Sequence, residues 1–199
     1  MAVPCPRCGR QYDVALFPFG RTIHCACGSR VGLEPRTRWG AQGGEVRFLV
    51  DAMLGRLARW LRILGYDASY VSDIADAELA RRAFEEDRVV VTRDRAFPEE
   101  WRIPRVLVLE SEAPLEQLRT VVPAFDLDWR KRLFTRCSSC NREIEPVPRE
   151  EVAERVPPRV LREQHDFLRC PGCERIYWEG SHLDRMRHTL EDTLGNLGD

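Results

Sequence analysis

The stretch FLVDAMLGRLARWLRILGYDASYV, residues 48–71, decides the fold class of this chain. Its apolar start predicts a buried strand over 46–50, and its leucines are then spaced for one face of a helix over 53–64. A second short strand is predicted over 68–71. A strand, a helix and another strand in this order are typical of a parallel sheet covered by helices.

The same alternation continues after this stretch. The pattern predicts a helix over 76–86, strands over 89–92 and 105–109, and a helix over 115–125. A repeated strand and helix alternation favours an α/β domain in which the carboxyl ends of the strands share one edge of the sheet.

Closely spaced pairs of cysteines stand on both sides of the α/β region. Two knuckle turns can direct four thiolates at one ion, which is the usual arrangement of a structural zinc site. In a reducing compartment such pairs are more often metal ligands than disulfides. The first predicted ribbon uses Cys5, Cys8, Cys25 and Cys27, and the second uses Cys137, Cys140, Cys170 and Cys173. We therefore expect two structural zinc ions.

The two ribbons differ in their predicted detail. In the first, residues 12–16 and 21–24 predict a hairpin between the knuckles, and His24 is an alternative ligand beside the short Cys25-Ala26-Cys27 pair. The second has a longer insert with helical patterns over 149–156 and 160–164. A terminal helix is predicted over 182–194.

Composition divides the chain into four parts. We expect a zinc ribbon over 1–34, a glycine-rich linker over 35–45, the α/β domain over 46–130 and a second ribbon module over 131–199. No apolar run is long enough for a signal peptide or a membrane helix. The sequence thus predicts a soluble cytoplasmic protein with no membrane partner.

Carboxylates follow the predicted strands. Asp51 follows the first strand, Asp73, Asp76 and Glu78 follow the second, Asp94 follows the third and Glu110 follows the fourth. A single acid at such a place can serve only as a helix cap. Acids after three strands would converge at one sheet edge and repel each other unless Mg²⁺ or Mn²⁺ neutralised them. The pattern indicates a metal site suited to phosphodiester hydrolysis.

Two groups of motifs carry a family resemblance. Residues 48–67 and the run RVVVTRD at 88–94 resemble the Mut-seven C-terminal RNase domain family, a branch of the PIN-like nucleases. The second ribbon is similar to that of the family around both of its knuckles and in the run IYWEGSH at 176–182. The resemblance implies a PIN-like three-layer α/β/α sandwich, an acidic Mg²⁺ or Mn²⁺ site and RNA as substrate.

The resemblance also assigns the acids by position. Asp51 matches the first acid, and Asp94 matches the acid of the Thr-Arg-Asp motif. For the middle acid Asp76 ranks before Glu78, Asp73 lies close by, and Glu110 is a weaker fourth candidate. Some relatives carry a ubiquitin-like segment before the nuclease, whereas this chain carries a zinc ribbon with an excess of arginine over acids.

Arginines beside these motifs are candidates for RNA contact. They are Arg56, Arg59, Arg62 and Arg93. The first three lie opposite the leucine stripe of the predicted helix, a position that an ordinary solvated helix face also explains.

The leading hypothesis is a metal-dependent ribonuclease, a hydrolase that cleaves RNA phosphodiester bonds. The alternative is a non-catalytic protein that binds RNA or the ribosome through its ribbons. A third class is a protein-interaction adaptor, because zinc ribbons also bind proteins.

Overall fold

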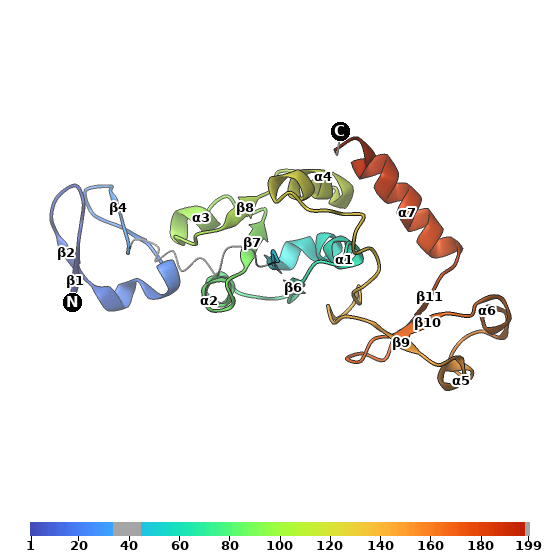
Figure 1. The fold of residues 1–199 in the computed structure, drawn as a ribbon. Coiled ribbons are helices and arrows are strands. Elements are labelled where there is room, and N and C mark those ends of the chain that lie inside the picture. The colour runs from blue at the N-terminus through green and yellow to red at the C-terminus, as the bar shows by residue number, and fades with distance from the viewer. Residues whose placement is uncertain (34–44, 198–199) are drawn as a thin grey trace. The chain divides into compact units, whose positions relative to one another are not determined.

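The computed structural model describes residues 1–33 and 45–197. The predicted linker lies outside the described residues except for Glu45. The chain forms two compact units, one of Met1–Gly55 with Ser69–Glu110 and one of Arg56–Ala68 with Ser111–Asp199. Each unit contains one cysteine ribbon together with part of the α/β region (Figure 1).

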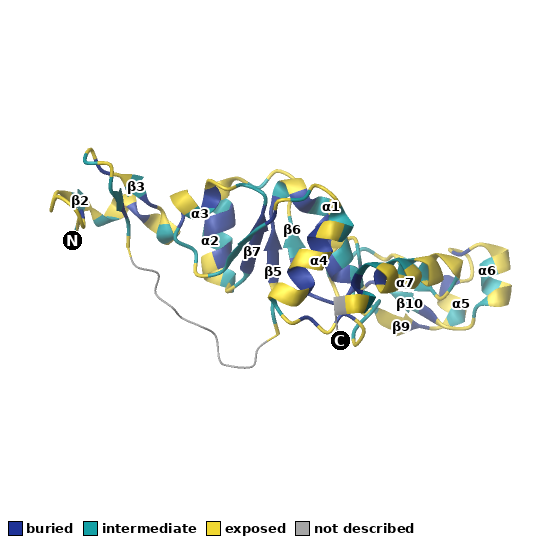
Figure 2. Cartoon of the chain, turned by 90° about the horizontal axis from the view of Figure 1, so that it is seen from above, coloured by how far each residue is buried: buried dark blue, intermediate teal, exposed yellow. Residues whose placement is uncertain are grey.

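A four-stranded parallel sheet lies at the centre of the α/β region. Its strands are β5 (Phe48–Val50), β6 (Ala68–Tyr70), β7 (Val89–Thr92) and β8 (Val106–Val108). Their order is β6-β5-β7-β8, and β5 and β8 pair with β7 in parallel. Strands β5 and β7 are buried throughout, as parallel strands covered on both faces should be (Figure 2). The predicted α/β class is confirmed.

The helices follow the predicted alternation. They are α1 (Gly55–Ile63), preceded by the 3₁₀ turn η3 (Ala52–Leu54), α2 (Asp76–Glu86), α3 (Phe97–Glu100) and α4 (Pro114–Ala124). The bounds of α2 and β7 are those predicted from the sequence, and α3 is a short addition that the pattern did not predict.

Helices α2 and α3 contribute to one core cluster within the first unit. Leu79, Ala80 and Ala83 line one stripe of α2 and pack with Leu49 and Val90 of the sheet. Phe97 and Trp101 complete the cluster, with their ring centroids 6.4 Å apart. Because these apolar side chains are almost completely withdrawn from water, their burial is the main term that stabilises this unit.

The N-terminal ribbon consists of two small antiparallel pairs. Strand β1 (Ala2–Pro4) pairs with β2 (Gln11–Asp13), and β3 (Ile23–His24) pairs with β4 (Arg30–Val31). The predicted hairpin between 12–16 and 21–24 is therefore wrong. Each strand pairs across its own cysteine knuckle, and the 3₁₀ turns η1 (Val14–Leu16) and η2 (Pro18–Gly20) occupy the space between.

The C-terminal ribbon has a three-stranded antiparallel sheet of order β11-β10-β9. Its strands are β9 (Glu145–Val147), β10 (Phe167–Arg169) and β11 (Ile176–Trp178). The insert forms α5 (Arg149–Val152), which is shorter than predicted, and α6 (Pro158–Glu163), which begins two residues before the predicted segment and ends one residue earlier. Helix α7 (Ser181–Leu194) follows. Val147, Val152, Val156 and Phe167 form a small core there.

In the part of the chain that the structure describes, no helix has both the length and the apolar character needed to span a bilayer.

Candidate functional site

Two predicted acids lie where the strand order of the parallel sheet reverses. The chain runs from β5 out to β6 and then returns to β7 on the other side of β5, so β5 and β7 flank the topological switch point. Asp51 follows β5 directly, and Asp94 lies two residues after the end of β7. Open parallel sheets bind ligands in the crevice beyond the carboxyl ends of such strands.

The hydroxyl of Thr92 connects these two acids. It donates to the Asp51 carboxylate at 2.5 Å and accepts from the backbone N–H of Asp94 at 2.9 Å. Thr92 is completely buried and Asp51 is 6% exposed. Asp51 occupies the N-cap position of η3 but makes no side-chain cap hydrogen bond. Its carboxylate is thus held toward the sheet edge rather than used to cap the turn.

Backbone hydrogen bonds fix the surroundings of this pair. The N–H of Asp51 donates to the carbonyl of Val91 at 3.0 Å, which extends the pairing of β5 with β7 by one residue. The Asp94 carboxylate accepts from the N–H of Ala96 at 2.8 Å, in an Asx turn that begins α3. Both carboxylates therefore have a defined position before any ligand binds.

Asp76 shares the electrostatic field of these two acids. It is the first residue of α2, where the helix dipole favours a carboxylate. Partial burial raises its pKa, and the negative charges of Asp51, Asp94 and Glu100 raise the pKa further. The charges of Asp51, Asp94 and Glu100 are therefore near enough to Asp76 to act on its pKa.

The other predicted acids have different surroundings. Glu78 accepts from Arg81 through both carboxylate oxygens, at 2.6 and 2.7 Å, and this hydrogen bonding lowers the pKa of Glu78. Asp73 lies in the loop before α2 and, like Asp76, is exposed. Glu110 forms a surface ion pair with Arg95 at 3.3 Å.

Two groups of four cysteines have the geometry of metal sites. In each group the four sulfurs lie within 4.8 Å of one another, and in residues 1–33 and 45–197 no group of acids is gathered as tightly. The shortest sulfur–sulfur distances are 3.5 Å, between Cys8 and Cys25, in the first group and 3.2 Å, between Cys140 and Cys170, in the second. A tetrahedral zinc ion with Zn–S bonds of about 2.3 Å requires sulfurs about 3.8 Å apart. Both groups could hold zinc, and His24 belongs to neither.

The knuckles share a backbone pattern that explains their residues. In three of them the N–H of the residue after the second cysteine donates to the carbonyl of the first, and that residue has a positive φ. The positions are Gly9, Asn141 and Glu174. The shorter Cys25-Ala26-Cys27 knuckle closes in the same way through Gly28, one residue earlier. The four sulfurs of the N-terminal ribbon therefore come together even though this knuckle has one residue fewer between its cysteines.

Each ribbon also has a tyrosine that the sequence reasoning missed. Tyr177 lies four residues after Cys173, and its hydroxyl is 3.0 Å from the sulfur of Cys137. Burial raises the pKa of Cys137, but the Tyr177 hydroxyl and two backbone amides outweigh it and lower the pKa to about 6. Tyr12 lies four residues after Cys8. The pKa of Cys25 is lowered to about 6, first by a hydrogen bond from the amide of Cys27 and second by the hydroxyl of Tyr12. The repeated spacing was the available signal.

The family model described as the Mut7-C RNAse domain matches residues 46–190. The chain belongs to the Mut7-C RNAse domain family. The match includes the acids at the switch point and the whole C-terminal ribbon, while the N-terminal ribbon precedes it. Searches of curated proteins and of solved structures found no match.

The predicted RNA-contact arginines of this Mut7-C RNAse domain fall into two groups. Arg56 and Arg59 are exposed on α1, and Arg93 is half-buried in the Thr-Arg-Asp motif. Arg62 differs from the prediction, because it is only 5% exposed. It donates to the carbonyls of Ala68, Ser138 and Ser139, so it joins α1 to the first knuckle of the C-terminal ribbon.

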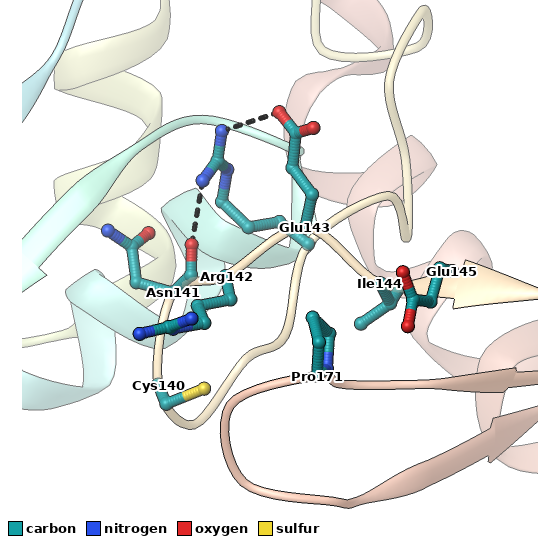
Figure 3. A pocket seen from close by; sticks show the side chains of 8 residues that line it. Cys140, Asn141, Arg142, Glu143, Ile144, Glu145 and Pro171 are labelled. Atoms are coloured by element: carbon teal, nitrogen blue, oxygen red, sulfur yellow. Dashed lines mark hydrogen bonds and ion pairs between the residues drawn. The ribbon is translucent and has the colours of Figure 1, made fainter.

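A shallow open pocket lies beside that knuckle in the Mut7-C RNAse domain (Figure 3). Arg136 is one of its lining residues and donates to the carbonyl of Asn141 at 2.7 Å and to the carboxylate of Glu143 at 3.0 Å. Its lining is mixed in charge, with Arg142 and Glu145 both exposed. The pocket contains none of the predicted acids.

Proposed function

We propose that this protein is a metal-dependent ribonuclease that hydrolyses RNA phosphodiester bonds at the acids beside the switch point. The observation that carries the proposal is the Thr92 hydroxyl, which joins the buried Asp51 carboxylate to the turn that holds Asp94. Asp51 is buried, is fixed by a hydrogen bond and makes no cap hydrogen bond, and a carboxylate held in this way at a sheet edge is a candidate functional group.

The donor set fits a hard divalent cation. Asp51, Asp76 and Asp94 offer carboxylate oxygens, which are the ligands that Mg²⁺ and Mn²⁺ prefer. The pKa of Asp76 is raised first by burial and then by the negative charges of Asp51, Asp94 and Glu100, and a bound cation would relieve the second of these effects. When bound, such an ion supplies Lewis acidity that activates water and stabilises charge on the phosphate.

Other residues of the chain hold the carboxylates of Asp51 and Asp94 in position. Thr92 donates to one oxygen of Asp51 and thereby fixes the rotamer of that carboxylate. The Ala96 amide does the same for Asp94. We assign the middle position to Asp76 rather than Glu78, because both oxygens of Glu78 are engaged by Arg81. Carboxylates that are already held in position would need less reorganisation in the transition state.

RNA is the substrate class that the family description supports. Exposed Arg56 and Arg59 on α1 supply positive charge for a phosphate backbone, and the N-terminal ribbon adds further arginines. Contacts of this kind weaken steeply with salt, so binding should fall as ionic strength rises.

The experiment compares cleavage of labelled single-stranded and structured RNAs by the wild type, Asp51→Asn and Asp94→Asn with added Mn²⁺ or Mg²⁺. We expect each variant to lose about 10³-fold in rate, the size typical of losing one charge-stabilising group. Asp73→Asn and Glu78→Gln are matched controls that should keep near wild-type rates. Variants are preferable to a chelator, which would also remove zinc.

The second candidate is a non-catalytic protein that binds RNA or the ribosome, and the presence of two ribbons favours it. Under that function the wild type cleaves no RNA with either ion, and RNA affinity is the same in Asp51→Asn as in the wild type. Binding to a protein partner without RNA affinity would instead indicate an adaptor.

A further inference from the structure

We propose that the N-terminal ribbon positions Asp94 by holding α3, so that the ribbon is part of the nuclease centre. The consequence for cleavage rests on the proposed function. The observation is a set of hydrogen bonds, within one compact unit, between the ribbon and the last carbonyls of α3. The ribbon lies outside the matched family region, and its role here follows from these contacts alone.

Helix α3 has only four residues and needs support from outside. A helix this short cannot form stably alone, and its last carbonyls have no partner within the helix. The ribbon supplies the donors. The Thr22 hydroxyl donates to the backbone carbonyl of Glu99 at 2.7 Å, and the Thr22 amide donates to the backbone carbonyl of Glu100 at 2.7 Å. Arg30 donates to the carbonyls of Pro98 and Glu99, both at 3.1 Å.

The contact is close as well as polar. The N–H of Arg102, just after α3, donates to the carbonyl of Gly20 at 2.7 Å. Gly20 has a φ of +82°, and a Cβ added there would lie 2.7 Å from the carbonyl oxygen of Arg102. Arg21 lies over the ring of Trp101, whose core position anchors this end of α3. The ribbon is therefore fitted to α3 at backbone level, which an incidental contact between flexible side chains would not require.

From α3 the constraint continues to the acid. The amides of Glu99 and Glu100 donate to the carbonyl of Ala96, at 2.9 and 3.0 Å. The amide of Ala96 in turn donates to the Asp94 carboxylate at 2.8 Å. A short series of hydrogen bonds thus runs from Thr22 through Glu100 and Ala96 to Asp94. The donor that orients Asp94 belongs to a turn whose far end is held by the ribbon.

The test uses the full-length protein with both zinc ions and measures amide hydrogen exchange together with RNA cleavage. Gly20→Ala forces the ribbon away from Arg102. Gly28→Ala is the matched control, since Gly28 also has a φ of +82° but its Cβ would meet nothing within 4 Å. Thr22→Val removes the hydroxyl donor with little change of shape, and Thr22→Ser restores it.

We expect Gly20→Ala to speed exchange of the Ala96, Glu100 and Trp101 amides by about tenfold and to lower the cleavage rate by a similar factor. Thr22→Val should do the same by about threefold to fivefold, with recovery in Thr22→Ser. Gly28→Ala should leave these amides at wild-type exchange rates. Zinc content, measured in every variant, must stay at two per chain for the comparison to count.

Wild-type exchange at these amides in Gly20→Ala and in Thr22→Val would overturn the inference. Faster exchange with an unchanged cleavage rate would also overturn it, because Asp94 would then need no support from the ribbon. A wild type that cleaves no RNA would refute the proposed function instead, and exchange at the Ala96 amide would still decide whether the ribbon holds the Asp94 turn.

Discussion

The two cysteine ribbons offer the same set of four thiolates to a metal ion but are joined to the α/β region in opposite ways. Each has four sulfurs within 4.8 Å of one another and a tyrosine four residues after a knuckle. In the N-terminal ribbon, Thr22 and Arg30 are donors and the carbonyls of α3 accept. In the C-terminal ribbon, the knuckle carbonyls of Ser138 and Ser139 accept from Arg62 of α1.

The two joints also differ in burial. Arg30 and its partner Glu99 are accessible to water, whereas Arg62 is 5% exposed. Burial lowers the pKa of Arg62, and the charges of Cys137 and Cys140 act against this. The C-terminal joint further includes Asn141, which accepts from the amide of Ala68 at 3.0 Å. The loss of one partner destabilises a protein most when the hydrogen bond is buried, so the C-terminal ribbon should contribute more to the free energy of unfolding. The N-terminal ribbon should contribute more to the position of the predicted catalytic acids.

Loss of one zinc ligand should give the largest effect. Cys170 is completely buried, and Cys170→Ser should release one of two zinc ions and lower the melting temperature by about 10 °C or more, because structural zinc binding is also folding free energy. Cys8→Ser, at an exposed ligand of the other ribbon, should release one zinc ion with a smaller thermal effect. Metal analysis with thermal unfolding checks both. Equal losses of melting temperature would remove the distinction between the ribbons.

Removal of the buried joint should rank second. Arg62→Met retains the apolar length of the side chain but leaves three carbonyls without their donor, and we expect a loss of about 2–4 kcal/mol in the free energy of unfolding. Arg59→Met, at an exposed site on the same helix, should change stability by less than about 0.5 kcal/mol. Denaturant unfolding of the zinc-loaded protein measures both. A similar stability for the two variants would contradict the role given to Arg62.

Much of the fold could be predicted from the sequence because its signals are local. The bounds of α2 were readable from its apolar stripe, and those of β7 from its run of valines. The N-terminal strand pairing was not predictable in this way. Its strands are short, and which of them pair is decided by knuckle closure through Gly9 and Gly28 rather than by alternation of apolar residues.

The candidate site was predictable only in part, for a similar reason. Acids after strands are visible in sequence, so Asp51 and Asp94 could be proposed directly. The bridging hydroxyl of Thr92 depends on the register of β5 with β7. Arg62 was placed with Arg59 by helical periodicity, which cannot reveal that two carbonyls 76 and 77 residues farther along the chain accept hydrogen bonds from it.

A smaller effect is expected from the tyrosine hydroxyl that each ribbon places beside one of its cysteines. Tyr177→Phe removes the hydroxyl beside Cys137 without changing the ring, and Tyr12→Phe does the same for Cys25. Each variant should lose zinc about tenfold faster to a competing chelator, the size typical of groups that support metal ligands. Release of zinc from a single ribbon in each variant shows which site is affected. Wild-type release rates from both variants would mean that these hydroxyls do not support the thiolates.

The smallest effect should come from Asp76, which lies in the same unit as the N-terminal ribbon. Its pKa is raised in the folded protein, by partial burial and then by Asp51, Asp94 and Glu100. Ionised Asp76 therefore destabilises the fold. This cost is absent below the pKa of the unfolded chain and grows as pH rises through the folded pKa. Asp76→Asn should raise the melting temperature by roughly 1–2 °C at pH 7.5.

The pH and metal dependence of that difference identify its cause. The advantage of Asp76→Asn over the wild type should shrink as the pH falls toward 4.5, since protonation then removes the charge in the wild type as well. Saturating Mn²⁺ should also shrink it, because a cation among the acids relieves the repulsion in the wild type. An advantage that is independent of both pH and Mn²⁺ would mean that the variant acts through the α2 N-terminus and not through the acids. The inference of a metal site from the charges around Asp76 would then lose its main support.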